Sequence, residues 1–119
     1  MKKIKVFHLT HCGTCKKILN SFDTSVCSLQ DIKETKIKAD ELDKMAKLIG
    51  SYEALFSRKA VKYQTMGLKD KVLTEKDYRK LILEDYTFLK RPVMWSGKTV
   101  LAGHTKEAIQ GMIDLVNAT

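Results

Sequence analysis

The sequence has little proline and glycine, with one proline and six glycines among 119 residues. This scarcity argues against a disordered or low-complexity chain, because such segments are usually rich in these residues. No stretch approaches the roughly 18 apolar residues that a membrane-spanning helix needs, so we expect no membrane association. The apolar content of 44% and charged content of 30% instead indicate a folded globular protein, with a length that suits one hydrophobic core.

Cysteine is also scarce, and its number limits what it can do. The three residues Cys12, Cys15 and Cys27 fit a disulfide framework poorly. The basic start resembles that of a signal peptide, but the apolar stretch behind it ends by His8 and no small-residue cleavage site follows. We therefore expect a cytoplasmic protein, where a CxxC pair is more often catalytic or redox-sensing than structural.

Acidic residues are outnumbered, 14 against 22 basic ones, which gives a net charge of +8. Such a charge could serve a nucleic acid, an acidic protein surface or a small oxyanion. The basic residues are scattered along the chain, with no arginine-rich arm and no aromatic and basic RNA-binding signature. We therefore expect a solvated basic surface and no direct nucleic-acid binding.

The order of predicted elements indicates an α/β fold. A strand at 4–9, a helix at about 14–22 and a second strand at 25–32 form a crossover unit. A helical insert follows at about 39–90, with Leu42, Met45, Leu48 and Ile49 as an apolar stripe. Strands at 93–95 and 99–102 and a final helix after Thr105 complete the chain. This β-α-β, helical insert, β-β-α order predicts a thioredoxin-like, four-stranded mixed sheet in a single domain over residues 1–119.

The pair of thiols at Cys12-Gly13-Thr14-Cys15 is the most informative motif. It stands between the first predicted strand and the helix, so backbone N–H groups and the helix dipole would favour a thiolate at Cys12. Cys15, about one turn further on, could close a disulfide with it. Two other interpretations are two buried thiols and half a zinc site, but zinc needs two more ligands and no second CxxC or HxxxH is present, so we expect no metal.

The only proline, Pro92, stands just before the third predicted strand. In a thioredoxin-like fold this is the place of a cis-proline beside the active-site cysteine, although a proline can also simply initiate a strand. The preceding Arg91 favours a site, because a guanidinium offers a tetrahedral oxyanion two parallel hydrogen bonds and a permanent charge.

These features together resemble a known family. The segment His8 to Cys15, the residues Arg58-Lys59 followed by Tyr63 and Gly67-Leu68, the segment Leu89 to Val93 and the later Val100-Leu101-Ala102-Gly103 are similar to the ArsC/Spx family of arsenate reductases and related proteins. The resemblance covers nearly the whole chain. Its specific part is the combination of an N-terminal Cys12 with Arg91-Pro92.

The resemblance implies roles for individual residues. Cys12 would be the nucleophile that attacks arsenate and forms a thiol–arsenate adduct, and Arg91 would bind the oxyanion beside Pro92. Arg58 would also bind it, although Lys59 could fill that position instead. His8 matches a histidine that helps to depress the thiol pKa in the family, and a half-buried strand histidine is the alternative.

The sequence differs at two positions from the reductases of this family, so the resemblance implies two branches, the arsenate reductases and Spx. Reductases that use glutaredoxin carry a third oxyanion arginine after the position of Gly103, where this chain has His104, and glutathione supplies their second thiol. Here Cys15 offers an internal resolving thiol, with glutathione and glutaredoxin or thioredoxin as electron donors. The CxxC is characteristic of Spx, a redox-sensing regulator that binds the RNA polymerase α subunit, so arsenate and that subunit are the two implied partners.

Overall fold

The computed structural model describes residues 4–119, which divide into two compact units. The first comprises the described residues up to Thr35 together with Arg91–Thr119, and the second is Lys36–Lys90. The sequence predicted an insert at about 39–90 within a single domain, and that domain assignment stays a prediction.

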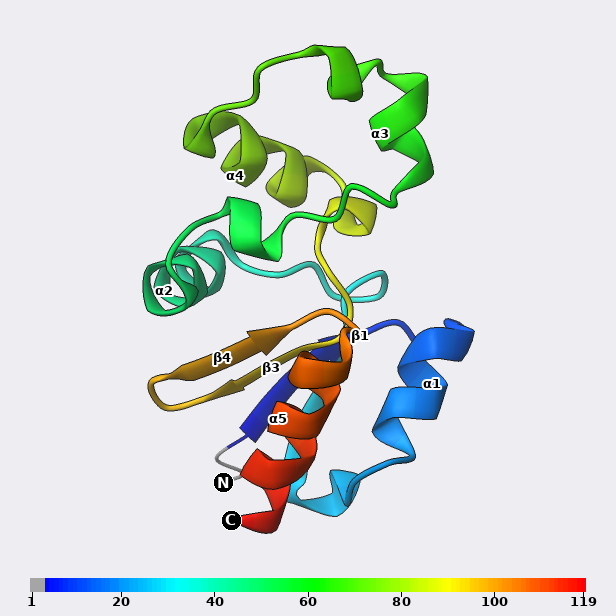
Figure 1. Cartoon of the computed structure of the whole chain (residues 1–119), viewed down its shortest axis with the longest axis vertical. Coiled ribbons are helices and arrows are strands. Elements are labelled where there is room, and N and C mark those ends of the chain that lie inside the picture. Colours follow the sequence, from blue (N-terminus) through cyan, green and yellow to red (C-terminus); the bar gives the residue numbers. More distant parts are fainter. Residues whose placement is uncertain (1–3) are drawn as a thin grey trace. The chain divides into compact units, whose positions relative to one another are not determined.

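The first unit contains a four-stranded mixed sheet flanked by two helices (Figure 1). Its elements are β1 (Ile4–His8), α1 (Gly13–Leu19), η1 (Thr24–Val26), β2 (Cys27–Asp31), β3 (Val93–Ser96), β4 (Thr99–Ala102) and α5 (Lys106–Asn117). The strand order is β2-β1-β3-β4, with β1 parallel to β2 and antiparallel to β3, and β3 antiparallel to β4. The α/β class and the mixed four-stranded sheet predicted from the sequence are confirmed.

The core of this unit forms on one face of the sheet. Alternate residues of β1 point to the same face, so Ile4 and Val6 meet Ile18 of α1 and Met112 of α5. All four are nearly or completely buried. Burial of large apolar side chains contributes about 1.5–3 kcal/mol each, which fixes both helices against the sheet.

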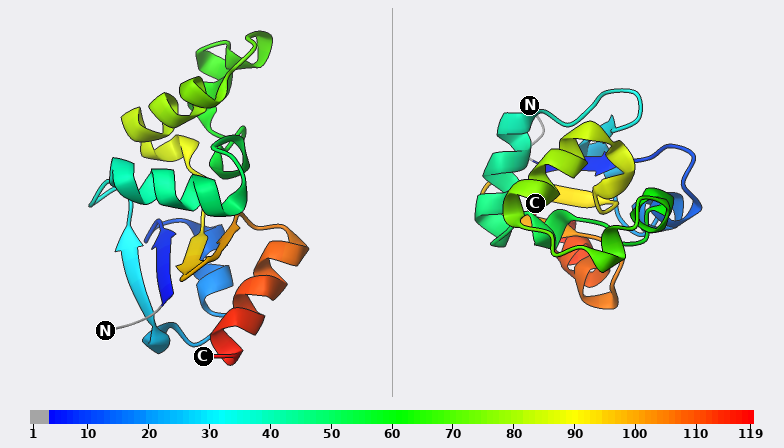
Figure 2. Two further views of the ribbon diagram at one scale, coloured as in Figure 1. Left: turned by 90° about the vertical axis from the view of Figure 1, so that its left-hand side faces the viewer. Right: turned by 90° about the horizontal axis from the view of Figure 1, so that it is seen from above.

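The second unit is built from short helices. Its elements are α2 (Ala39–Ile49), η2 (Glu53–Leu55), α3 (Val61–Thr65), η3 (Leu68–Asp70), α4 (Glu75–Glu84) and η4 (Tyr86–Phe88). Their order along the chain can be followed in Figure 2. Phe56 lies at the centre of an aromatic cluster, with its ring centroid 5.3 Å from that of Phe88, 4.8 Å from that of Tyr78 and 6.0 Å from that of Tyr63.

Two helices of this unit have well-defined ends. Gly50 ends α2 with a φ of 117°, a left-handed conformation that favours glycine. Thr74 caps α4 by accepting a hydrogen bond from the Asp77 N–H, while the Asp77 carboxylate accepts one from the Thr74 N–H. This reciprocal pair satisfies backbone donors that the first turn of a helix leaves unpaired.

Several predicted boundaries and faces were wrong. Helix α1 ends at Leu19 rather than near Phe22, and β2 begins at Cys27, because Asp23 accepts a hydrogen bond from the Ser25 N–H at 2.9 Å and starts a 3-10 turn instead of a strand. Leu48 is 40% exposed. It lies six residues after Leu42, which at 100° per residue turns it away from the buried face of α2.

Candidate functional site

The strand register brings most of the predicted site residues to one end of the sheet. Phe7 pairs with Val93, and Val93 pairs with Ala102. The loop that leads from β1 to Cys12, the segment Arg91-Pro92 and the turn at Gly103-His104 therefore all emerge at this end. Segments distant in sequence meet there because β3 runs antiparallel to both of its neighbours.

Cys12 is the residue that immediately precedes helix α1. Its carbonyl oxygen accepts the first helical hydrogen bond, from the Lys16 N–H at 3.0 Å, and its own N–H donates to the Leu9 carbonyl at 3.3 Å. The Cys12 side chain makes no capping hydrogen bond of ordinary geometry. The N–H groups of Thr14 and Cys15 in the first turn nevertheless act on the sulfur and favour its thiolate.

The two thiols of the motif differ in protonation. Partial burial works to raise the pKa of Cys12, but the Cys15 N–H and thiol, the Thr14 N–H and the Arg91 charge outweigh it and lower that pKa. Burial, together with the hydrogen bond to Cys12 and its charge, raises the pKa of Cys15 to about 11. Cys15 therefore stays a thiol that can donate to a Cys12 thiolate, and Cys12 is the thiol of the pair that ionises more readily.

This difference predicts how alkylation of Cys12 depends on pH. Because the pKa of Cys12 is lowered, we expect iodoacetamide to modify it with a midpoint below the ordinary thiol value of 9.0. Cys15→Ala removes a donor and should raise the midpoint, whereas Cys15→Ser keeps a donor and should shift it less. Mass spectrometry of timed samples locates the adduct, and equal midpoints in the two variants would contradict the proposed hydrogen bond.

The cysteine loop is anchored by Asp31, a residue that the sequence analysis missed. The Asp31 carboxylate accepts hydrogen bonds from the N–H groups of Thr10 at 2.9 Å, Lys33 at 2.8 Å and Glu34 at 3.3 Å. Interactions with the Thr10 side chain and N–H lead in holding the pKa of this carboxyl well below its usual range. The signal was available in principle, because Asp31 ends a strand parallel to β1, and polar residues at the carboxyl ends of adjacent parallel strands lie close together.

Arg91 and Pro92 border the site from the start of β3. The Arg91–Pro92 peptide bond is cis, as the thioredoxin-like fold predicted. The Pro92 carbonyl accepts a hydrogen bond from the Gly103 N–H at 2.9 Å, which ties the turn before His104 to the same segment. His104 is exposed there. Arg91 acts on both thiols through its charge, favouring the thiolate in each.

His8 is more deeply buried than the half-buried alternative assumed, with 8% of its surface exposed. Its Nδ1 atom is buried and has no hydrogen-bond partner among residues 4–119. Buried polar atoms are normally paired, so this nitrogen has bonding capacity that the local packing does not use. The role of His8 toward the thiol stays a prediction.

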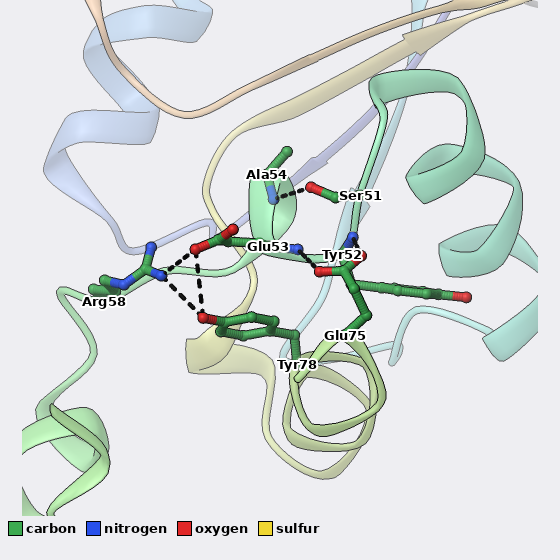
Figure 3. Close-up of polar contacts among 7 residues, drawn as sticks. All are labelled: Ser51, Tyr52, Glu53, Ala54, Arg58, Glu75 and Tyr78. Carbon is green, nitrogen blue, oxygen red and sulfur yellow. Dashed lines mark hydrogen bonds and ion pairs between the residues drawn. The ribbon is translucent and has the colours of Figure 1, made fainter. Parts of the chain in front are cut away.

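Arg58 belongs to the second unit. Its Nη2 atom donates to Glu53 Oε2 at 2.6 Å and to the Tyr78 hydroxyl at 3.0 Å (Figure 3). The guanidinium carbon also lies 5.7 Å from the centroid of the Tyr78 ring. Lys59, the alternative to Arg58, is exposed. The contact of Tyr78 with Arg58 has no signal in the sequence, because a tyrosine at helical spacing is usually only a packing residue.

The remaining candidate features concern metals, cysteine and membranes. Within residues 4–119, no three His, Cys, Asp or Glu side chains converge as metal ligands would.

Cys27 is buried in the core of the first unit, as a small apolar residue would be. Across the same described residues, no helix is both long enough and apolar enough to cross a membrane.

Comparison with known proteins places this geometry in a family. The family model described as ArsC family matches residues 7–112. Among solved structures, an ArsC family related protein from Bacteroides fragilis has a TM-score of 0.79 at 22% identity, covering 92% of this chain and 97% of that one. Arsenate reductase from Vibrio cholerae has a TM-score of 0.74 at 16% identity, covering 95% and 96%.

A third solved structure, an arsenate reductase (ArsC) related protein from Brucella melitensis, has a TM-score of 0.67 at 20% identity, covering 92% of each chain. No curated protein matches the chain significantly. These likenesses establish the fold, and the family match extends over most of the sequence. The chain belongs to the ArsC family.

Proposed function

We propose that the protein is a thiol-dependent oxidoreductase that reduces arsenate, with Cys12 as its nucleophile. The observation that carries this proposal is the Cys12 sulfur, whose pKa is lowered by the first turn of α1, by Cys15 and by Arg91. A thiolate beside a permanent cation suits attack on an anionic electrophile, because the cation offsets the repulsion between sulfur and substrate. Membership of the ArsC family supports arsenate as that electrophile.

The proposed reaction has two steps. The Cys12 thiolate attacks the arsenic(V) centre, an S–As bond forms, and an oxygen of arsenate leaves as water after taking up protons. A second thiolate then attacks the Cys12 sulfur, so that a disulfide forms and the S–As bond breaks. The electron pair of that bond stays on arsenic, which leaves as arsenite, while two thiols have been oxidised to one disulfide.

Several residues would support these steps without forming bonds to arsenic. Arg91 would hold the oxyanion through its guanidinium, with Arg58 as a second cation and His104 in place of a third. Pro92 would border the substrate, and His8 would help to lower the pKa of the Cys12 thiol. An imidazole lacks the two parallel N–H groups of a guanidinium, so His104 would hold the oxyanion less firmly than the arginine it replaces.

The thiol that attacks the Cys12 sulfur in the second step determines which electron donor the protein uses. Cys15 hydrogen-bonds to Cys12 but stays protonated near neutral pH because its pKa is about 11. We therefore propose glutathione with glutaredoxin as the first choice and thioredoxin, acting after attack by Cys15, as the second. Both systems maintain reduced thiols in the cytoplasm, which we propose as the location of the protein.

An arsenate-dependent assay tests this function directly. The purified protein is mixed with glutathione, glutaredoxin, glutathione reductase and NADPH, and the oxidation of NADPH is followed after arsenate is added. A parallel reaction replaces glutathione and glutaredoxin with thioredoxin and its reductase. We expect consumption that saturates with arsenate in at least one reaction, and no dependence on arsenate in either would remove the enzyme proposal.

A redox regulator of the Spx type is the second candidate function. It is favoured by the hydrogen bond between the Cys15 thiol and Cys12, which brings together the two sulfurs of a switch disulfide. In this case oxidation would change an interface with the RNA polymerase α subunit. Reduced and oxidised protein are immobilised and exposed to purified polymerase, and no α-subunit binding in either state would eliminate this candidate.

A further inference from the structure

The guanidinium of Arg58 is already engaged by a carboxylate. Its Nη2 atom donates to Glu53 Oε2 and to the Tyr78 hydroxyl, and the Tyr78 hydroxyl lies 3.4 Å from the same Glu53 oxygen. The three side chains thus form a closed polar triangle, which Figure 3 shows between η2, the residues after it and α4. An anion that approaches Arg58 meets a cation whose charge is already balanced.

The Arg58 atom that contacts Glu53, Nη2, is the most important one for anion recognition. An arginine binds a tetrahedral oxyanion most strongly through two parallel N–H groups, either Nε with Nη2 or Nη1 with Nη2. Nη2 belongs to both of these pairs. Because Nη2 donates to Glu53 and Tyr78, an oxyanion can form either bidentate pair with Arg58 only after it displaces one of them.

Hydrogen bonds to neighbouring side chains fix the backbone at Glu53. The Glu75 carboxylate at the start of α4 accepts hydrogen bonds from the Tyr52 N–H at 2.7 Å and the Glu53 N–H at 3.1 Å. The Ala54 N–H donates to Ser51 Oγ at 3.1 Å in the same turn. The backbone from which the Glu53 carboxylate reaches Arg58 is therefore ordered before any ligand arrives.

The ion pair is nevertheless displaceable. The Arg58 and Glu53 side chains are 47% and 51% exposed, so water screens their attraction and can solvate the carboxylate once it leaves. A dianion competes better than a monoanion for the vacated guanidinium because its charge is larger. The Tyr78 hydroxyl, released from Glu53, can then donate a hydrogen bond to the incoming oxyanion.

We propose that Glu53 is a selectivity residue that keeps Arg58 closed to monoanions and yields it to a dianionic tetrahedral oxyanion. This inference rests on the proposed function, because it takes Arg58 as a substrate-binding residue. Glu53 acts through Arg58 and makes no bond to the substrate. Its effect is on oxyanion binding and not on the chemical step at Cys12.

The test compares Glu53→Gln with Glu84→Gln, which removes the same charge from α4 at a side chain that pairs with Lys80 rather than with Arg58. Arsenate and nitrate are titrated calorimetrically into each protein in a Cys12→Ser background without glutathione, so that neither an adduct with arsenic nor turnover follows. We expect Glu53→Gln to lower the Kd for arsenate by about two- to five-fold and to lower that for nitrate by more. Glu84→Gln should leave both values near those of the unsubstituted protein.

Steady-state kinetics separate this effect from a structural one. Glu53→Gln should lower KM for arsenate with kcat unchanged, whereas damage to the fold would lower kcat. Equal Kd values in Glu53→Gln and Glu84→Gln, or a benefit that persists when Arg58→Lys is added, would overturn the inference. The binding measurement does not depend on turnover. Arsenate that binds without being reduced would therefore contradict the proposed function, and the Kd values would still decide the role of Glu53.

Discussion

Cys12→Ser is expected to remove arsenate-dependent NADPH oxidation. A serine hydroxyl is not ionised near neutral pH, so neither the first turn of α1 nor Arg91 can make it an effective nucleophile at arsenic. Loss of an attacking residue commonly costs a factor of about 10³ or more in rate, which would bring the signal to the background of the coupled assay. Activity that survives this substitution would exclude Cys12 as the attacking group.

Cys15→Ser is the matched variant, because it changes the same atom type three residues away. We expect it to retain most of the rate supported by glutathione and glutaredoxin, since Cys15 is buried, has a pKa of about 11 and can be replaced as a donor by a hydroxyl. If Cys15→Ser instead fails as completely as Cys12→Ser, Cys15 is the resolving thiol. The unchanged fold of both variants is checked by circular dichroism.

The sheet, and the placement of Cys12 and Pro92 at one end of it, could be predicted from the sequence because their signals are local. The apolar segment before Cys12 marks the first strand of a crossover unit, and the short segments on either side of Gly97 mark a pair of strands joined by a tight turn. The proline before β3 and the cysteine before α1 then come to the same end of the sheet through the register alone.

The polar contacts that tune the site could not be predicted in this way. Asp31 lies some twenty positions from the Thr10 that it binds, and Glu53 lies 22 positions from the Glu75 that holds its N–H. Such pairs depend on the path that the loops take between helices and strands. The spacing of apolar residues in the sequence contains no information about that path. Helix α3 was missed for a related reason, since it is short and has no buried residue that would give it an apolar stripe.

Arg91→Ala is expected to have the second-largest effect on arsenate reduction. Arg91 favours the thiolate at Cys12 through its charge, and its guanidinium is the proposed binding group for the oxyanion. Loss of one such donor to a developing negative charge costs about 10²–10³ in kcat/KM. The pKa of Cys12 should rise at the same time, which the pH profile of iodoacetamide modification measures in the same preparation.

Arg91→Lys separates these two contributions. A lysine keeps the positive charge, so the alkylation profile of Cys12 should stay near that of the unsubstituted protein. It lacks the two parallel N–H groups, so kcat/KM for arsenate should still fall, to a value between those of the unsubstituted protein and Arg91→Ala. Lys98→Ala, at an exposed position of the β3–β4 turn, controls for the loss of one charge and should change neither quantity. If Arg91→Lys restores full activity, the charge of Arg91 alone is sufficient and its planar geometry is not part of the mechanism.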